Sequence, residues 1–133
     1  MQETIHKLGP LVGRIFLASI FLMSGIGKIG GFTGTAGYMV SKGMPMAEVL
    51  LAITIVIEIG AALMLILGWK AKIGAALLFA WMIPVTFLFH NFWAVPPADQ
   101  QMQTIMFMKN LGLMGGMLYI MAFGAGPMSV DKK

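Results

Sequence analysis

The side chains best able to do chemistry in this 133-residue chain are a few ionisable groups that interrupt long apolar runs. Glu58 lies deep within one run, and Arg14, His90 and Lys109 each interrupt another. An ionisable group inside a bilayer costs about 2.5–3.5 kcal/mol even on lenient insertion scales, so it usually faces the protein interior and finds a partner. His90, Lys109 and Glu58 are therefore the candidate catalytic residues.

Glu58 and Arg14 form the first candidate site. Glu58 lies 12 residues into its run, which is roughly 18 Å at 1.5 Å per residue and just past the bilayer midplane. Arg14 has a long side chain that could reach a carboxylate about two helical turns away. It shares one helical face with Ala18, Phe21, Gly25 and Lys28. We predict a buried Arg14–Glu58 ion pair. The alternative is an Arg14 that extends to lipid headgroups and a neutral Glu58.

A second group of polar and aromatic side chains is predicted near the outer surface. His90, Asn91 and Trp93 end one apolar run, and Lys109 and Asn110 lie near the start of the next. An imidazole beside a lysine, two amides and an indole suits a flat, proton-coupled headgroup such as a quinone. Alternatively, His90 only caps a helix and Lys109 extends to the headgroups. A single histidine at this depth argues against a metal site.

The elements that must position these groups are four apolar runs, at about residues 11–29, 46–67, 73–92 and 104–123. Each is close to the 20 residues that a membrane-spanning helix needs. Charged residues make up 11% of the chain and hydrophobic residues 59%, which nearly excludes a soluble domain. The net charge of +4 is scattered, so nucleic acid is not an expected partner. The fold class is an all-α, integral membrane four-helix bundle, with residues 1–133 as one domain.

Two further features concern the ends of the bundle. Region 32–43 carries threonines suited to a helix start and Gly43 as a stop, which predicts a short interfacial helix between spans one and two. Basic residues indicate the orientation, because cytoplasmic loops carry more of them. One side would hold Lys7, Arg14, Lys70, Lys72, Lys132 and Lys133, and the other only Lys28, Lys42 and Lys109. We expect both termini in the cytoplasm of a bacterium, and membrane lipid around the spans.

The pattern resembles the DoxX family of small bacterial membrane proteins over about residues 9–130. The similarity rests on Gly13-Arg14, Ser24-Gly25-x-Gly27-Lys28, Gly34-Thr35-Ala36-x-Tyr38-Met39-x-x-x-Gly43-x-Pro45, Glu58-x-Gly60, Leu67-Gly68, His90-Asn91-Phe92-Trp93 and Lys109-Asn110-Leu111. The resemblance implies a relation to DoxD, the membrane subunit of an archaeal thiosulfate:quinone oxidoreductase that works with a second subunit. If the protein binds a cofactor, the resemblance implies that this cofactor is a quinone.

Three functions follow as hypotheses. The first is an accessory or anchoring subunit of a respiratory or redox membrane complex, with other membrane subunits or further copies of the chain as partners. The chain has no cysteine, so redox chemistry would need a bound cofactor or a partner. The second is a quinone-reactive subunit of a sulfur-compound (thiosulfate):quinone oxidoreductase that uses His90, Asn91, Lys109 and Asn110. The third is a small proton-coupled transporter with Glu58 as its ion site.

Overall fold

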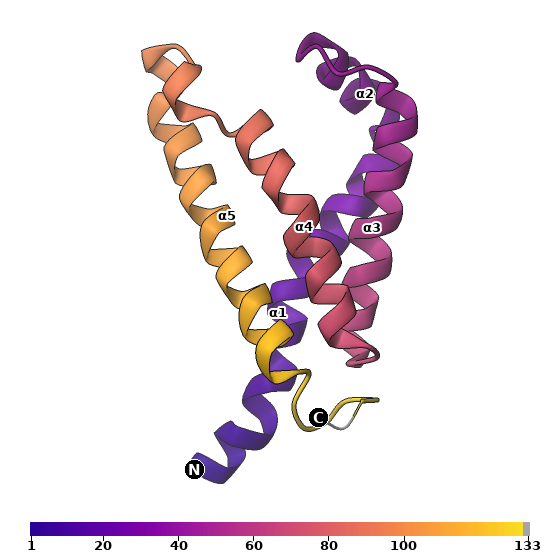
Figure 1. Ribbon diagram of the computed structural model, residues 1–133, viewed down its shortest axis with the longest axis vertical. Helices are drawn as coiled ribbons and strands as arrows, with labels where there is room; N and C mark the ends of the chain where they lie inside the picture. The colour runs from indigo at the N-terminus through magenta and orange to yellow at the C-terminus, as the bar shows by residue number, and fades with distance from the viewer. Residues whose placement is uncertain (132–133) are drawn as a thin grey trace.

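The computed structural model describes residues 1–131, which fold into five α-helices and one short 3-10 helix (Figure 1). The helices are α1 Gln2–Gly30, α2 Phe32–Ser41, α3 Ala47–Leu67, α4 Ala71–Phe89 and α5 Pro97–Phe123, with the 3-10 helix η1 at Phe92–Ala94. No strand occurs within residues 1–131, and four helical segments are long and apolar enough to cross a membrane. The predicted all-α, four-span architecture is confirmed. Lys132 and Lys133, which entered the prediction of orientation, lie outside the described residues.

Three of the helix boundaries differ from the predicted spans. α1 begins at Gln2 and α5 at Pro97, earlier than residues 11 and 104, because helical hydrogen bonds are local and continue beyond the apolar stretch. Pro97 fits the first turn, where its missing N–H has no helical acceptor to lose. α4 ends at Phe89, so His90 and Asn91 lie outside the helix and not in its last turn.

The spanning helices form a bundle that opens toward one end. α3 packs against both α1 and α4, and α5 packs mainly against α4. Figure 1 shows both termini and the α3–α4 turn at one end, which we call the terminal end. At the opposite end, the α2 end, α5 and α4 diverge from α3 and its neighbour α2 (Figure 1).

The apolar core has two parts that reflect this opening. The larger cluster joins all four spanning helices and includes the fully buried Ala18, Leu65, Leu78 and Met117. The smaller cluster lies where α2 packs on the start of α3 and consists of Ala36, Met39, Ala47 and Leu51. α2 is therefore a short helix held to the bundle by one apolar face, and Val40 next to Met39 is 62% exposed.

Gly25 permits a close approach between α1 and α3. A Cβ added there would lie 2.7 Å from Cγ1 of Ile59 and 3.3 Å from Cβ of Glu58. Any side chain at this position would force Ile59 or the helix backbones to shift, since such contacts are shorter than van der Waals distance. The absence of a side chain at Gly25 thus brings Glu58 within reach of groups on α1.

Candidate functional site

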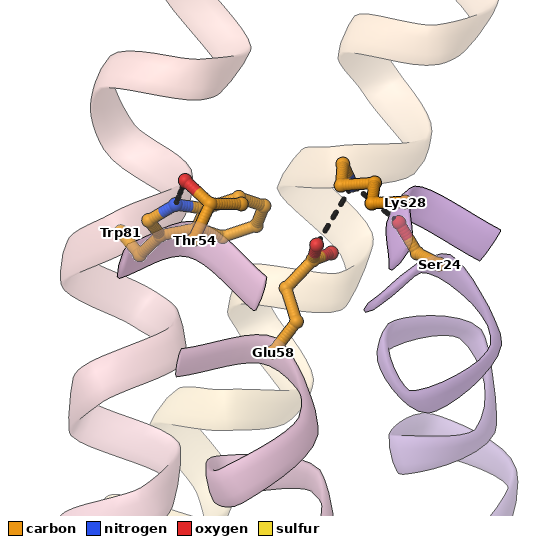
Figure 2. Close-up of polar contacts among 5 residues, drawn as sticks. All are labelled: Ser24, Lys28, Thr54, Glu58 and Trp81. Carbon is orange, nitrogen blue, oxygen red and sulfur yellow. Dashed lines mark hydrogen bonds and ion pairs between the residues drawn. The ribbon is translucent and has the colours of Figure 1, made fainter. Parts of the chain in front are cut away.

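Glu58 forms an ion pair with Lys28 inside the bundle (Figure 2). Nζ of Lys28 lies 2.7 Å from Oε1 of Glu58 and donates a second hydrogen bond to Oγ of Ser24 at 2.6 Å. Glu58 is 2% exposed, whereas the Lys28 side chain is 24% exposed. Ser24 lies one turn before Lys28 on α1 and holds the ammonium over the carboxylate. A buried charge is stabilised in this way when it is both paired and hydrogen-bonded.

The predicted partner of Glu58 was wrong, because Arg14 lies elsewhere and binds backbone carbonyls. Its guanidinium donates to the carbonyl oxygens of Leu65 at 2.9 Å and Ile66 at 3.1 Å. It also donates to Pro127 at 3.4 Å and Met128 at 2.8 Å. The last carbonyls of a helix lack intrahelical partners, and those of α3 lie at the level of Arg14. The two terminal nitrogens of the guanidinium hydrogen-bond these carbonyls without a carboxylate.

Arg14 and Asp131 together fasten the C-terminal segment to the terminal end of the bundle. The carboxylate of Asp131 accepts hydrogen bonds from the backbone N–H groups of Lys70 at 2.8 Å and Ala71 at 2.9 Å. These are the first donors of α4, so Asp131 caps that helix from 60 residues away in the chain. Gly68 has a φ of +69° and lies against Ser129, where an added Cβ would overlap Cβ of Ser129. Arg14 and Asp131 therefore hold the C-terminal segment against the end of α3 and the start of α4.

The opening of the bundle contains a cavity of about 560 Å³. Its walls come from α3 and α4, including Thr54, Trp81 and Phe89, and α2 contributes Tyr38. Lys28, His90 and Gln103 also line it. Ligand pockets commonly enclose about 300–1,000 Å³ and combine apolar walls with a few polar groups. The cavity therefore has the size and chemistry of a small-molecule site.

Aromatic side chains give the cavity fixed flat surfaces. Nε1 of Trp81 donates to Oγ1 of Thr54 at 3.2 Å, which holds the indole between α3 and α4 (Figure 2). Nζ of Lys28 lies 5.9 Å from the centre of the same indole, within the range of a cation–π contact. Toward the α2 end, Tyr38 and Phe89 stack with ring centres 5.7 Å apart.

His90 lines the cavity from the end of α4. Its Nδ1 lies 2.9 Å from Oε1 of Gln103, which links the end of α4 to the first turns of α5. In the tautomer with the proton on Nδ1, His90 donates to this amide oxygen, and Nε2 is left as an acceptor for another partner. His90 follows Trp81 by nine residues and directly follows the last residue of α4, so the backbones of the two residues lie roughly 14 Å apart.

The other residues of the predicted outer group do not gather around His90. Asn110 is buried and donates to Oγ1 of Thr86 at 3.0 Å, so it joins α5 to α4. Trp93 is 54% exposed and belongs to an aromatic cluster with Phe87, Phe92 and Phe107. Neither side chain lines the cavity.

Asn91 and Lys109 also lie outside the cavity. Oδ1 of Asn91 is buried and accepts no hydrogen bond from residues 1–131. Lys109 is exposed on α5, where its Nζ lies 3.6 Å from Sδ of Met106. It leans toward the helix start, as helical side chains do. The residues that sequence reasoning missed are Lys28, Trp81 and Gln103. Of these three residues, only Lys28 was indicated by the sequence, because it lies on the same face of α1 as Arg14.

Fold and site together define a small four-span membrane protein with a cavity beside a buried ion pair. The sequence model of the DoxX family matches residues 9–91, and the chain belongs to that family.

Two relatives from Escherichia coli align over most of both chains. Inner membrane protein YqjF is 33% identical over 131 residues, which cover 98% of this chain and 95% of YqjF. Inner membrane protein YphA is 31% identical, over 92% of this chain and 88% of YphA. A Surfeit locus protein 4 homolog from Schizosaccharomyces pombe is 28% identical over 92% of this chain but only 36% of its own length. No solved structure matches. The relatives and the four apolar helices support a four-span protein of the inner membrane.

Proposed function

We propose that the chain is a small quinone-binding subunit of a redox assembly in the inner membrane. The observation that carries the proposal is the cavity of about 560 Å³, with aromatic walls and with Lys28 and His90 at separate points of its lining. A quinone headgroup is flat and largely apolar, and its carbonyl oxygens accept hydrogen bonds. The aromatic walls match the flat, apolar ring, and Lys28 and His90 are the polar groups that match its carbonyl oxygens.

The accessory role completes the proposal, because the chain supplies no thiol to carry electrons. It has no cysteine among its 133 residues, so a partner subunit would deliver or remove the electrons while this chain holds the quinone. Isolation from gently solubilised membranes should give a complex with a second polypeptide at fixed stoichiometry. Recovery as a lone particle would count against the accessory role and leave the binding role open.

The binding role is tested with Trp81 as a reporter, since a quinone in contact with an indole quenches its fluorescence. A Trp69→Phe/Trp93→Phe protein keeps Trp81 as its only tryptophan. Titration of this protein in nanodiscs with a short-chain benzoquinone should give saturable quenching. A matched protein that keeps only Trp69, which lies at the terminal end and is 46% exposed, should show only weak quenching that rises linearly with quinone.

A pair of substitutions on α4 provides the structural control. Val85 lines the cavity, so Val85→Phe should fill part of it and weaken saturable quenching at least tenfold. Ile83 is on the same helix, is 42% exposed and does not line the cavity, so Ile83→Phe should leave quenching unchanged. Quenching that is linear for Trp81 and unaffected by Val85→Phe would rule out a quinone in this cavity.

The transport hypothesis has less support from the geometry. Glu58 already has Lys28 as a basic partner at 2.7 Å, and an ion site at that carboxylate would have to displace it. Proton uptake into proteoliposomes that is abolished by Glu58→Gln would restore this alternative.

We further propose that both termini face the cytoplasm. The terminal end of the bundle carries Lys7, Arg14, Lys70 and Lys72 within the described residues, against Lys28, Lys42 and Lys109 toward the α2 end. Because the chain lacks cysteine, single-cysteine proteins report the orientation directly. A membrane-impermeant maleimide added to intact spheroplasts should label Asp99→Cys and should not label Lys7→Cys. The opposite pattern would overturn the orientation.

A further inference from the structure

The cavity reaches the lipid-facing side of α3. A stripe of exposed residues runs along this helix at intervals of three or four positions, and it consists of Val49, Ile53, Val56, Gly60, Leu63 and Leu67. Ile53 is 50% exposed and also lines the cavity. Glu58 follows it by five residues, so the two side chains point roughly 140° apart around α3. The cavity therefore extends from the exposed side of α3 toward the interior side, where Lys28 binds Glu58.

The cavity also reaches the lipid-facing side of α4. The exposed stripe of α4 has the same spacing and consists of Ile73, Leu77, Ala80, Pro84 and Leu88. Pro84 and Leu88 line the cavity, and Leu88 is 48% exposed. The exposed sides of α3 and α4 thus border the cavity with three apolar side chains, those of Ile53, Pro84 and Leu88. We call this border the lateral gap.

The lateral gap begins next to the point where α3 and α4 are joined. Nε1 of Trp81 donates to Oγ1 of Thr54, and toward the α2 end α4 diverges from α3 (Figure 1). Ile53 precedes Thr54, and Pro84 follows Trp81 by three residues, so both lie within about one helical turn of this hydrogen bond. Nζ of Lys28 lies 5.9 Å from the centre of the Trp81 ring. The lateral gap and Lys28 therefore lie at nearly the same depth in the membrane.

At its α2 end the cavity is bordered by contacts between elements. The rings of Tyr38 on α2 and Phe89 on α4 stack with centres 5.7 Å apart. His90, beyond α4, lies 2.9 Å from Gln103 on α5. All four residues line the cavity. A ligand that came from the water beyond the α2 end would have to pass these contacts, whereas a ligand dissolved in the bilayer meets the apolar side chains of the lateral gap.

From these positions we infer that the ligand enters the cavity from the bilayer through the lateral gap and, when bound, keeps a hydrocarbon tail in that gap while its headgroup faces Lys28. The side chains of Ile53, Pro84 and Leu88 have no hydrogen-bonding group, so a headgroup gains a polar contact only when it lies inside. This inference rests on the proposed quinone-binding function and adds the class of ligand, a membrane quinone with a long tail, and its orientation.

The test compares two benzoquinones with one headgroup, one with a decyl tail and one without a tail. Quenching of Trp81 in the Trp69→Phe/Trp93→Phe protein measures binding in nanodiscs, with quinone expressed per lipid so that partition of the tail into the bilayer cancels. Ile53→Phe fills part of the lateral gap and should weaken binding of the decyl quinone about tenfold, and of the tail-free quinone about twofold or less. Leu63→Phe is the control, because Leu63 is on the same exposed stripe but does not line the cavity, and it should leave both affinities unchanged.

The outcomes separate this inference from the proposed function. Equal losses of affinity for the two quinones in the Ile53→Phe protein would overturn the placement of the tail and leave the quinone-binding function intact. If neither quinone gives saturable quenching in the reporter protein without Ile53→Phe, the proposed function itself is overturned, and the inference with it.

A second measurement needs no substitution. A decyl quinone that carries a photoreactive diazirine on the tail, next to the ring, is irradiated with the unsubstituted protein in nanodiscs, and labelled residues are identified by mass spectrometry. Excess unlabelled decyl quinone should lower labelling of Ile53 and Leu88. Labelling of Leu63, which is 45% exposed and does not line the cavity, should not change. Displaceable labelling of Tyr38 and Met44, with none at Ile53 or Leu88, would overturn the inference.

Discussion

The Lys28–Glu58 ion pair predicts a strong energetic coupling between two residues 30 positions apart. Lys28→Met should lower the free energy of unfolding by about 3 kcal/mol, because it leaves the Glu58 carboxylate buried without a partner. Glu58→Leu should cost about 2 kcal/mol, since the Lys28 side chain is already 24% exposed and can turn into the cavity. The double variant should also cost about 2 kcal/mol, because the two charges disappear together. The coupling energy is then about 3 kcal/mol.

Reversible unfolding in mixed detergent micelles, followed by tryptophan fluorescence and circular dichroism, measures the four proteins of this cycle. Lys42 and Glu48 provide a matched control, because both are exposed and form no ion pair with each other within residues 1–131. The Lys42→Met/Glu48→Leu cycle should be additive within about 0.5 kcal/mol. If the Lys28/Glu58 cycle is equally additive, the buried ion pair does not exist in the folded protein.

Three further predictions use the same unfolding assay. Gly25→Ala should lower the free energy of unfolding by about 1–3 kcal/mol, because the new Cβ would lie 2.7 Å from Ile59. Gly27→Ala is the control, because a Cβ there would have no atom within 4 Å. It should leave the stability unchanged or raise it by up to about 1 kcal/mol. Equal effects of the two substitutions would contradict the close approach of α1 and α3. Arg14→Lys should cost about 2–4 kcal/mol, because an ammonium cannot serve the four carbonyls that the guanidinium reaches. A loss below about 0.5 kcal/mol would exclude that role. Asp131→Ala should cost about 1 kcal/mol and raise hydrogen exchange at the first N–H groups of α4, and unchanged exchange there would show that Asp131 is not its cap.

The spans could be predicted because hydropathy is a property of each segment alone. A run of about 20 apolar residues needs a helix in lipid whatever its neighbours are, and the four runs and the short helix after the first span were all found in the structure. Helix ends were less predictable. His90 and Asn91 were expected in the last turn of a helix that in fact ends at Phe89.

The candidate site was predicted in composition but not in geometry. Glu58 and His90 were singled out because ionisable groups in apolar runs need partners, yet Arg14 was assigned to Glu58 and Lys109 to His90. Both partners depend on the depth and rotation of one helix against another. Lys28 reaches Glu58 because Gly25 lets α1 approach α3. Arg14 reaches the end of α3 because the C-terminal segment folds back beside it.

The amino-acid sequence by itself determined that this protein crosses the membrane four times, that it belongs to a small all-helical class and that a few ionisable groups must be shielded from lipid. Those properties follow from the solvation of each segment and require no knowledge of its neighbours. Only the tertiary structure decided that Lys28 neutralises Glu58, that Arg14 fastens the C-terminal segment and that α2, α3 and α4 enclose a cavity. Such contacts arise from the splay and rotation of whole helices, which the packing of many small and large side chains sets together.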